Sequence, residues 1–378
     1  MKRSRLCVLV ASLVVAMLAV PVAAGAAPST DRFIVVLKTN ADDPSAVAND
    51  HAKRHGARVQ AVYRHAVKGY AATMRSDRAA ALRSDARVVH VERDQVMSVT
   101  AQTVPWGIRK VGADVSSTKA GNGSGAVSNV NIYVIDTGVY KHSDLNVVKH
   151  VNYAGGTNTD CHGHGTHVAG TIAAKDNSSH VVGVAPGAPV TGVKVLDCKG
   201  SGWTSNIIKG IDWVTANAKK PAVANMSLGG GASNALDDAV RGSAASGVLY
   251  SIAAGNEGKD ACTSSPARAG AGVDNGIITV AATDSYDREA SWSNYGICVD
   301  VWAPGVSVLS TRKGGGTSWM SGTSMAAPHV GGGAALHLKG RTLDTPSVVE
   351  AALKLAVKTT GTLSKDKRSI VREYVGLL

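Results

Sequence analysis

Three short motifs place an aspartate, a histidine and a serine where each could take part in chemistry. Asp136 follows Val-Asn-Ile-Tyr-Val-Ile at 130–135, a run typical of a buried strand, and functional groups gather at the carboxyl ends of such strands in parallel sheets. His164 lies in the glycine-rich stretch 162–171, which continues as a helix. Ser324 precedes Pro328, a residue suited to a first helical turn, so we expect Ser324 at a helix N-terminus, where the helix dipole favours a developing anion.

Each motif alone has an ordinary structural explanation. A strand-end aspartate can cap a turn, and a serine before a helix is a common N-cap. Asn256 favours the catalytic interpretation over these structural ones, because it follows the strand-like run 251–255 and its amide can donate to an oxyanion. The four residues together supply a nucleophile, a base, a group that orients the base and a donor for a tetrahedral intermediate, which is the set that acyl transfer requires.

The histidines also allow a second interpretation, a metal-dependent hydrolase. His162, His164 and His167 lie close together, and imidazoles are common zinc ligands. The sequence has no His-Glu-x-x-His pattern, however, so we expect no catalytic metal, with His162 in a loop and His167 packed on a helix. A thiol protease is disfavoured, because no cysteine has the histidine and helix context of Ser324.

The elements that must position these residues indicate an α/β enzyme. The chain has 378 residues, of which 44% are hydrophobic and only 18% charged, which favours a large core over disorder. Residues 103–378 alternate strand-like and helical runs, which predicts a parallel sheet with helices on both faces. Residues 28–102 predict a small α+β domain, with strands at 33–37, 67–72 and 88–92 and helices at 44–55 and 78–85.

Residues 1–27 predict a secretion signal that is removed from the mature protein. Lys2, Arg3 and Arg5 precede the apolar run 6–22, and small residues then offer a cleavage site. A membrane anchor is the alternative, but the run is marginally short for a span. We therefore expect an exported protein without a membrane anchor after cleavage.

The net charge of +12 raises the question of a nucleic-acid partner. Residues 103–378 carry 25 Lys and Arg against 20 Asp and Glu, so that part has a net charge of only +5. It contains no basic run interleaved with aromatic residues, and we expect an ordinary solvated surface and no nucleic-acid binding.

Four strings resemble the signatures of the subtilisin-like serine proteases. They occur in the order Asp, His, Ser that is typical of that family: Val-Ile-Asp-Thr-Gly at 134–138, His-Gly-Thr-His-Val-Ala-Gly-Thr at 164–171, Ala-Ala-Gly-Asn at 253–256 and Gly-Thr-Ser-Met-Ala-Ala-Pro-His at 322–329. Further strings at 104–108 and 293–296 resemble the proteinase K branch, nearest its aqualysin-like bacterial secreted members. Residues 31–100 resemble the inhibitory propeptide of such enzymes.

The resemblance implies a secreted serine endopeptidase that is made as a zymogen and cuts itself. Ser324 would attack the scissile carbonyl, His164 would transfer the proton, Asp136 would orient the imidazole, and Asn256 with the Ser324 N–H would hold the oxyanion. The propeptide would act as an intramolecular inhibitor, and its residues 99–102 would lie in the cleft as a substrate for Ser324. The other expected partners are protein and peptide substrates, and we expect a monomer.

The resemblance also implies where a substrate binds. The peptide would add a strand between two enzyme segments, and a roomy neutral pocket would favour an apolar or aromatic residue before the cut. Trp203 is either a lid over a more distant pocket or a packed surface residue. The expected strand-binding residues are Gly200, Ser201, Gly202, Ser227, Leu228, Gly229 and Gly230, and the pocket residues are Ala253, Ala254 and Gly255.

Four cysteines remain after Cys7 leaves with the signal, and they allow three disulfide pairings. The resemblance implies Cys161–Cys198 and Cys262–Cys298. It also implies a structural calcium ion bound by Asp300 and by backbone carbonyls near Asn275 and Ile277, although extra residues at 272–276 distinguish this chain, and an ordinary surface aspartate is the alternative.

A protein of this family that has lost catalysis and acts by binding is a further alternative. All four catalytic positions are filled, and nothing in the sequence supports that alternative.

Overall fold

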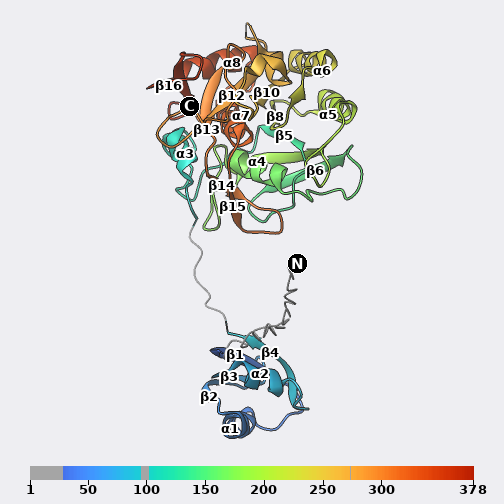
Figure 1. The fold of residues 1–378 in the computed structure, drawn as a ribbon, viewed down its shortest axis with the longest axis vertical. Helices are drawn as coiled ribbons and strands as arrows, with labels where there is room; N and C mark the ends of the chain where they lie inside the picture. The colour runs from blue at the N-terminus through green and yellow to red at the C-terminus, as the bar shows by residue number, and fades with distance from the viewer. Residues whose placement is uncertain (1–28, 95–101, 273) are drawn as a thin grey trace, which may run out of the picture. The chain divides into compact units, whose positions relative to one another are not determined.

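The computed structural model describes residues 29–94, 102–272 and 274–378 (Figure 1). The chain divides into two compact units, and the division falls between Ser98 and Val99. That division, like the predicted signal at 1–27, lies outside the described residues, and the predicted domain boundary at 102/103 stays a prediction. In the described part of the chain, no helix combines the length and the apolar character that a membrane span needs.

The first unit is a four-stranded antiparallel sheet with two helices. Its strand order is β2-β3-β1-β4. The predicted helix 44–55 is present with those bounds, whereas the sequence interpretation missed β2, an edge strand that is partly exposed. The elements are β1 (Thr30–Leu37), α1 (Pro44–His55), β2 (Arg58–Tyr63), β3 (Gly69–Arg75), α2 (Ser76–Leu82) and β4 (Val88–Arg93).

The second unit is built on a nine-stranded sheet whose order is β16-β17-β13-β12-β10-β8-β5-β7-β6. All neighbouring pairs are parallel except β16 and β17 at one edge. The strands are β5 (Asn131–Asp136), β6 (Asn146–Asn152), β7 (Pro189–Lys194), β8 (Ala222–Met226), β10 (Val248–Ala253), β12 (Ile277–Thr283), β13 (Val301–Pro304), β16 (Val357–Leu363) and β17 (Ser369–Glu373).

Helices cover both faces of this sheet, as predicted (Figure 1). Alternate residues of β5 enter two cores: Ile132 and Val134 pack with α4 and α7, and Tyr133 and Ile135 pack with α5 and α6. Both faces are therefore apolar, which explains the continuous hydrophobic run at 132–135. The helices are α3 (Trp106–Lys110), α4 (His164–Ala173), α5 (Thr204–Asn217), α6 (Asn234–Ala245), α7 (Thr323–Gly340) and α8 (Pro346–Leu355).

Three antiparallel pairs in the described part of the second unit were not predicted. They are the β16–β17 edge, a separate two-stranded sheet of β14 (Val308–Thr311) and β15 (Thr317–Met320), and a separate two-stranded sheet of β9 (Gly230–Gly231) and β11 (Ser264–Ser265). The first two pairs join strands that are near neighbours in sequence, and antiparallel strands need only a short turn, whereas parallel strands need a long crossover.

Glycines let helix α7 lie against the sheet. A Cβ at Gly332 would lie 2.5 Å from the Val184 Cβ, and a Cβ at Gly333 would overlap the Glu373 carboxylate. Glu373 on β17 is fully enclosed, and in the described structure neither of its carboxylate oxygens has a hydrogen-bond partner. Burial raises the pKa of Glu373 to about 8, so the group is a neutral acid beneath the helix that carries Ser324.

We expect Glu373→Gln to weaken the pH dependence of unfolding. As the pH rises from the ordinary glutamate value of 4.5 to about 8, the unfolded chain releases a proton that the folded chain retains, so the stability of the native protein falls over that window. The glutamine variant has no such proton to lose. Calorimetry of the inhibited enzyme at several pH values measures the melting temperature of both proteins. The same dependence of melting temperature on pH in the native protein and the variant would contradict the prediction.

Candidate active site

The buried carboxylate of Asp136 and the ring of His164 are in direct contact. Asp136 is the last residue of β5 and is fully buried, while His164 is the first residue of α4. The His164 Nδ1–H donates to Asp136, with Nδ1 2.8 Å from Oδ1 and 2.9 Å from Oδ2. The backbone N–H of Thr137 also donates to Asp136 Oδ1 at 2.6 Å. The contact orients the ring so that Nδ1 faces the carboxylate and Nε2 is left for proton transfer.

The charge of Asp136 controls the titration of His164. Burial alone would lower the pKa of His164, but the charge of Asp136 and the hydrogen bond to it outweigh burial, and the pKa lies above its ordinary value. Asp136 therefore stabilises the protonated imidazole, the form that a general base reaches after it accepts a proton.

A second buried carboxylate, Asp160, connects the two loops that carry this pair. Asp160 accepts hydrogen bonds from the Thr137 hydroxyl, the backbone N–H groups of His162, Gly163 and Thr166, and the Thr166 hydroxyl. Thr137 follows Asp136 and Gly163 precedes His164, so one carboxylate fixes the chain beside both catalytic candidates. Sequence reasoning missed Asp160, because its role depends on a contact between segments 23 residues apart.

Lys194 is another residue that sequence reasoning missed. It ends β7 with its side chain fully buried, and its Nζ donates to the carbonyls of Thr137 at 2.8 Å and Leu196 at 2.9 Å. A lysine inside the apolar run 189–196 was the available signal, since a buried ammonium needs partners. Its contacts hold the turn after Asp136 against the segment that leads to the substrate cleft.

Ser324 and Asn256 border one hollow from different elements. Ser324 is the second residue of α7, and its hydroxyl donates to the Ser227 carbonyl at 3.2 Å. The Asn256 Oδ1 accepts the Thr323 backbone N–H at 2.8 Å and the Thr323 hydroxyl at 3.0 Å. Because the amide oxygen is engaged by these donors, the Asn256 Nδ2 is the end left to donate to a ligand, as an oxyanion donor must.

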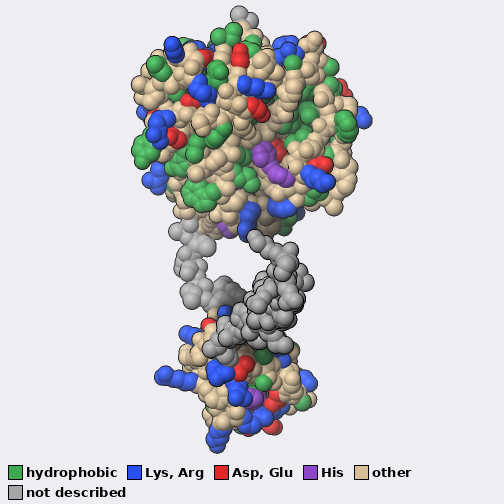
Figure 2. Space-filling model, in the orientation of Figure 1, with side chains coloured by type: hydrophobic (Ala, Val, Ile, Leu, Met, Phe, Trp, Pro, Cys, Tyr) green, Lys and Arg blue, Asp and Glu red, His purple; other side chains and the backbone are tan. Residues whose placement is uncertain are grey.

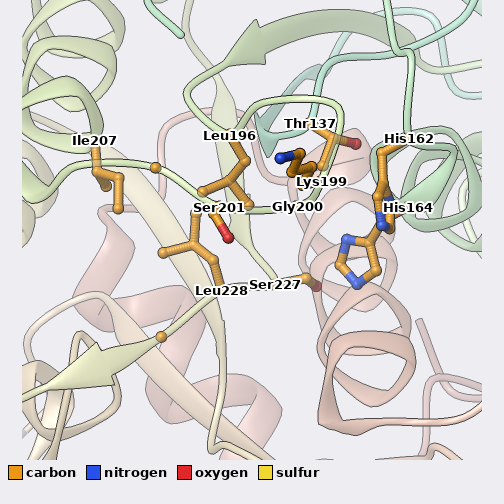
Figure 3. A pocket seen from close by; sticks show the side chains of 12 residues that line it. Thr137, His162, His164, Leu196, Lys199, Gly200, Ser201, Ile207, Ser227 and Leu228 are labelled. Carbon is orange, nitrogen blue, oxygen red and sulfur yellow. The ribbon is translucent and has the colours of Figure 1, made fainter.

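A second hollow adjoins the first, because Leu228 and Gly229 line both. Figure 3 shows His162 and His164 together at one end of it, Ile207 at the other, and Leu196 and Leu228 between them. The residues of the predicted strand-binding segments that line this second hollow are Gly200, Ser201, Gly202, Ser227, Leu228 and Gly229. The cleft therefore runs from the Asp136–His164 pair along both segments.

The predicted primary pocket needs one correction. Ala253 borders the hollow of Ser324 and Asn256, but Ala254 is fully buried in a separate core cluster with Ala281 and Trp302. Neighbouring side chains of an extended strand point to opposite faces, so Ala253 and Ala254 cannot both face the pocket. Gly255, the third predicted residue, donates its N–H to the Thr323 hydroxyl at 3.0 Å and has a φ of 106°. Trp203 is 80% exposed and borders a separate hollow beside Ser201 and Gly202.

The other two histidines of the 162–167 stretch have distinct environments. The His167 Nε2–H donates to the carbonyls of Val308 and Ser318, each 3.1 Å away, and burial lowers the pKa of His167 to about 4. That nitrogen is committed to the backbone and is not free to bind a metal. His162 lines the cleft with its ring 6.2 Å from that of His164.

The four cysteines of the second unit form the bridges Cys161–Cys198 and Cys262–Cys298. These are the pairings that the family resemblance implied. The first bridge joins the loop before His164 to the segment before Gly200, so it ties the histidine loop to one wall of the cleft.

The predicted calcium ligand Asp300 lies against a lysine. Its Oδ1 is 3.4 Å from the Lys354 Nζ, and its Oδ2 accepts the Thr279 backbone N–H at 2.8 Å. Both carboxylate oxygens therefore already have partners, which is a poor fit to a cation ligand. Calcium binding by this chain stays a prediction.

Gln102 does not lie in the cleft as predicted. Its side-chain amide donates to the carbonyls of Lys175 and Val181, and the Thr103 N–H donates to the His180 carbonyl at 2.7 Å. None of these partners lines either hollow. The remaining residues of the predicted cleft segment, 99–101, lie outside the described residues.

Comparison with known proteins identifies the family. Residues 127–371 match the Subtilase family, Peptidase S8. The extracellular serine proteinase of Thermus sp. (strain Rt41A) is 46% identical over 312 residues, which cover 79% of this chain and 73% of that protein. The chain belongs to the subtilase family. This subtilase is accordingly a serine endopeptidase, and its residues 32–100 match the Peptidase inhibitor I9 family.

Further relatives agree with the subtilase assignment. The alkaline serine protease ver112 of Corniculantispora psalliotae is 40% identical over 325 residues, covering 83% of this subtilase and 81% of the relative. The crystal structure of a cold-adapted subtilisin-like serine proteinase is similar with a TM-score of 0.63 and 40% identity, covering 74% of this chain and 98% of that one.

We expect the acidic limb of the pH–activity profile to lie above the ordinary histidine pKa of 6.5, because Asp136 raises the pKa of His164 and the base must be neutral to act. Asp136→Asn should move that limb to lower pH and reduce kcat by about 10⁴-fold, as in other Ser-His-Asp proteases. The measurement is kcat/KM against pH for both proteins. An unchanged limb in the variant would contradict the assignment.

We expect Asn256→Ala to lower kcat by about 10²–10³-fold, a range established for the corresponding donor in another member of this family. The KM should change little, because the donor acts on charge that develops after binding. Steady-state kinetics on a peptide substrate measure both constants, and a loss confined to KM would contradict an oxyanion role.

Proposed function

We propose that this subtilase is a secreted, self-processing endopeptidase in which Ser324, His164, Asp136 and Asn256 carry out the reaction. The observation that carries the proposal is the His164–Asp136 hydrogen bond in a cleft whose adjoining hollow is bordered by Ser324 and Asn256. These four groups have the chemistry of a nucleophile, a base, an orienting acid and an oxyanion donor.

In the proposed mechanism, the Ser324 hydroxyl attacks the scissile carbonyl as its proton passes to the His164 Nε2. The carbonyl oxygen becomes an oxyanion that accepts hydrogen bonds from the Asn256 Nδ2 and the Ser324 N–H. His164 then gives the proton to the leaving amine, and an acyl-enzyme forms. Water enters and attacks the acyl carbonyl as His164 takes a proton from it, and His164 returns that proton to the Ser324 oxygen as the second intermediate collapses and releases the acid product. Asp136 keeps the ring oriented in both halves of the reaction.

The substrate is proposed to be an extended protein segment lying along residues 200–202 and 227–229. Backbone pairing on both sides recognises chain geometry with little dependence on sequence, which supports broad specificity. The pocket for the residue before the cut is the hollow bordered by Ala253, Asn256 and Ser324. We propose that it accepts apolar and aromatic side chains.

We propose that the protein matures by secretion followed by removal of the propeptide. The Peptidase inhibitor I9 match at 32–100 supports inhibition by the chain's own N-terminal unit, and the Thermus relative is named an extracellular proteinase. Figure 2 shows Lys and Arg side chains scattered over the visible face of the larger unit, which supports a solvated surface without a nucleic-acid partner. We propose that the mature enzyme is a monomer.

A fluorophosphonate probe tests these proposals together. We expect mass spectrometry of the secreted protein to find one probe adduct, on Ser324, in a chain that begins near Thr103 and degrades casein. Ser324→Ala from a protease-free host should bind no probe and should retain residues 28–102.

Two results would count against the proposal. A folded native chain that takes no label would favour the alternative of a binding protein without catalysis. Complete processing of the Ser324→Ala chain in the protease-free host would contradict only the proposal that the protein cuts itself. The assignment of Ser324 as the nucleophile would then depend on the labelling result.

A further inference from the structure

Three carboxylates converge on one ammonium group at the start of strands β12 and β13. The Lys354 Nζ lies 2.6 Å from Asp274 Oδ1, 3.2 Å from Glu350 Oε1 and 3.4 Å from Asp300 Oδ1. Lys354 and Glu350 lie one turn apart on α8. The ammonium donates a hydrogen bond to the Glu350 Oε1 and forms ion pairs with Asp274 and Asp300, so its charge is shared among three carboxylates.

The second carboxylate oxygen of Glu350 holds the backbone at the start of β12. The Glu350 Oε2 accepts the N–H groups of Asn275 at 2.8 Å, Gly276 at 2.7 Å and Ile277 at 3.2 Å. Glu350 is fully buried, so its charge has to be matched inside the protein. Lys354 supplies that match and at the same time links α8 to Asp274 and Asp300.

We propose that the Lys354 ammonium takes the place of a calcium ion at Asp300, so that the loop 274–277 is held by a cation built into the chain. A calcium ion needs six to eight oxygen ligands at about 2.3–2.6 Å. The ammonium lies within contact distance of the carboxylates that would supply such ligands, so the lysine and a metal exclude one another.

The position of the cluster separates it from catalysis. Residues 274–277 and Asp300 lie at the amino ends of β12 and β13, whereas Asp136 and Asn256 lie at the carboxyl ends of β5 and β10 in the same parallel sheet. The proposed role is therefore structural: it concerns how the amino ends of β12 and β13 are stabilised and whether that stabilisation depends on calcium.

The test is the number of calcium ions bound by mature protein that a serine-directed reagent has inactivated, measured by isothermal titration with CaCl₂. Asp300→Asn in the otherwise native chain should leave this number unchanged, because Lys354 already fills the site. Lys354→Met should bind one ion more than the native protein, and Lys354→Met with Asp300→Asn should lose that ion again. Lys209→Met, at an exposed lysine of α5, is the matched control and should bind as the native protein does.

Melting temperatures give a second readout. In EDTA, Lys354→Met should melt below the native protein, and added calcium should raise its melting temperature more than that of Lys209→Met. Loss of one bound ion in the single Asp300→Asn variant would overturn the proposal, and this arm stands even if Lys354→Met does not fold. A folded Lys354→Met protein that gains no ion would overturn it as well.

Discussion

The buried carboxylate of Asp160 is the interaction on which the geometry of the site most depends. The residues that flank Asp136 and His164 belong to different elements. Backbone propensity alone does not place the end of a strand next to the start of a helix. Asp160 accepts donors from both segments and thereby fixes one loop against the other. A buried carboxylate needs several hydrogen-bond donors, so moving either loop away from Asp160 would break hydrogen bonds and cost free energy.

Other contacts also fix the segments around Asp160. Lys194 holds the carbonyl of Thr137 from the next strand of the sheet, and the Cys161–Cys198 bridge joins the histidine loop to a cleft wall. Across the cleft, α7 approaches the sheet through its glycines and presents Ser324, while Thr323 orients the Asn256 amide. Preorganised donors and bases of this kind need little rearrangement when charge develops in the transition state.

The two ends of the parallel sheet have different tasks. The carboxyl ends of β5 and β10 lead to the proposed catalytic groups Asp136 and Asn256, because the carboxyl ends of parallel strands lie on the same side of a sheet. The amino ends of β12 and β13 carry an internal ion cluster around Lys354 that binds α8 to the sheet.

The sequence by itself determined the family, the α/β class and the helix 44–55, and it predicted the four residues of the proposed reaction, because these depend on local motifs and on hydrophobic periodicity. It also supported the disulfide pairing, through resemblance. Only the tertiary structure decided that Asp160 and Lys194 support the site, that Ala254 faces the core, that Gln102 packs outside the cleft and that Lys354 lies against Asp300. Each of these rests on contacts between distant segments or on which face of a strand a side chain takes, and a linear pattern of residue types does not specify either.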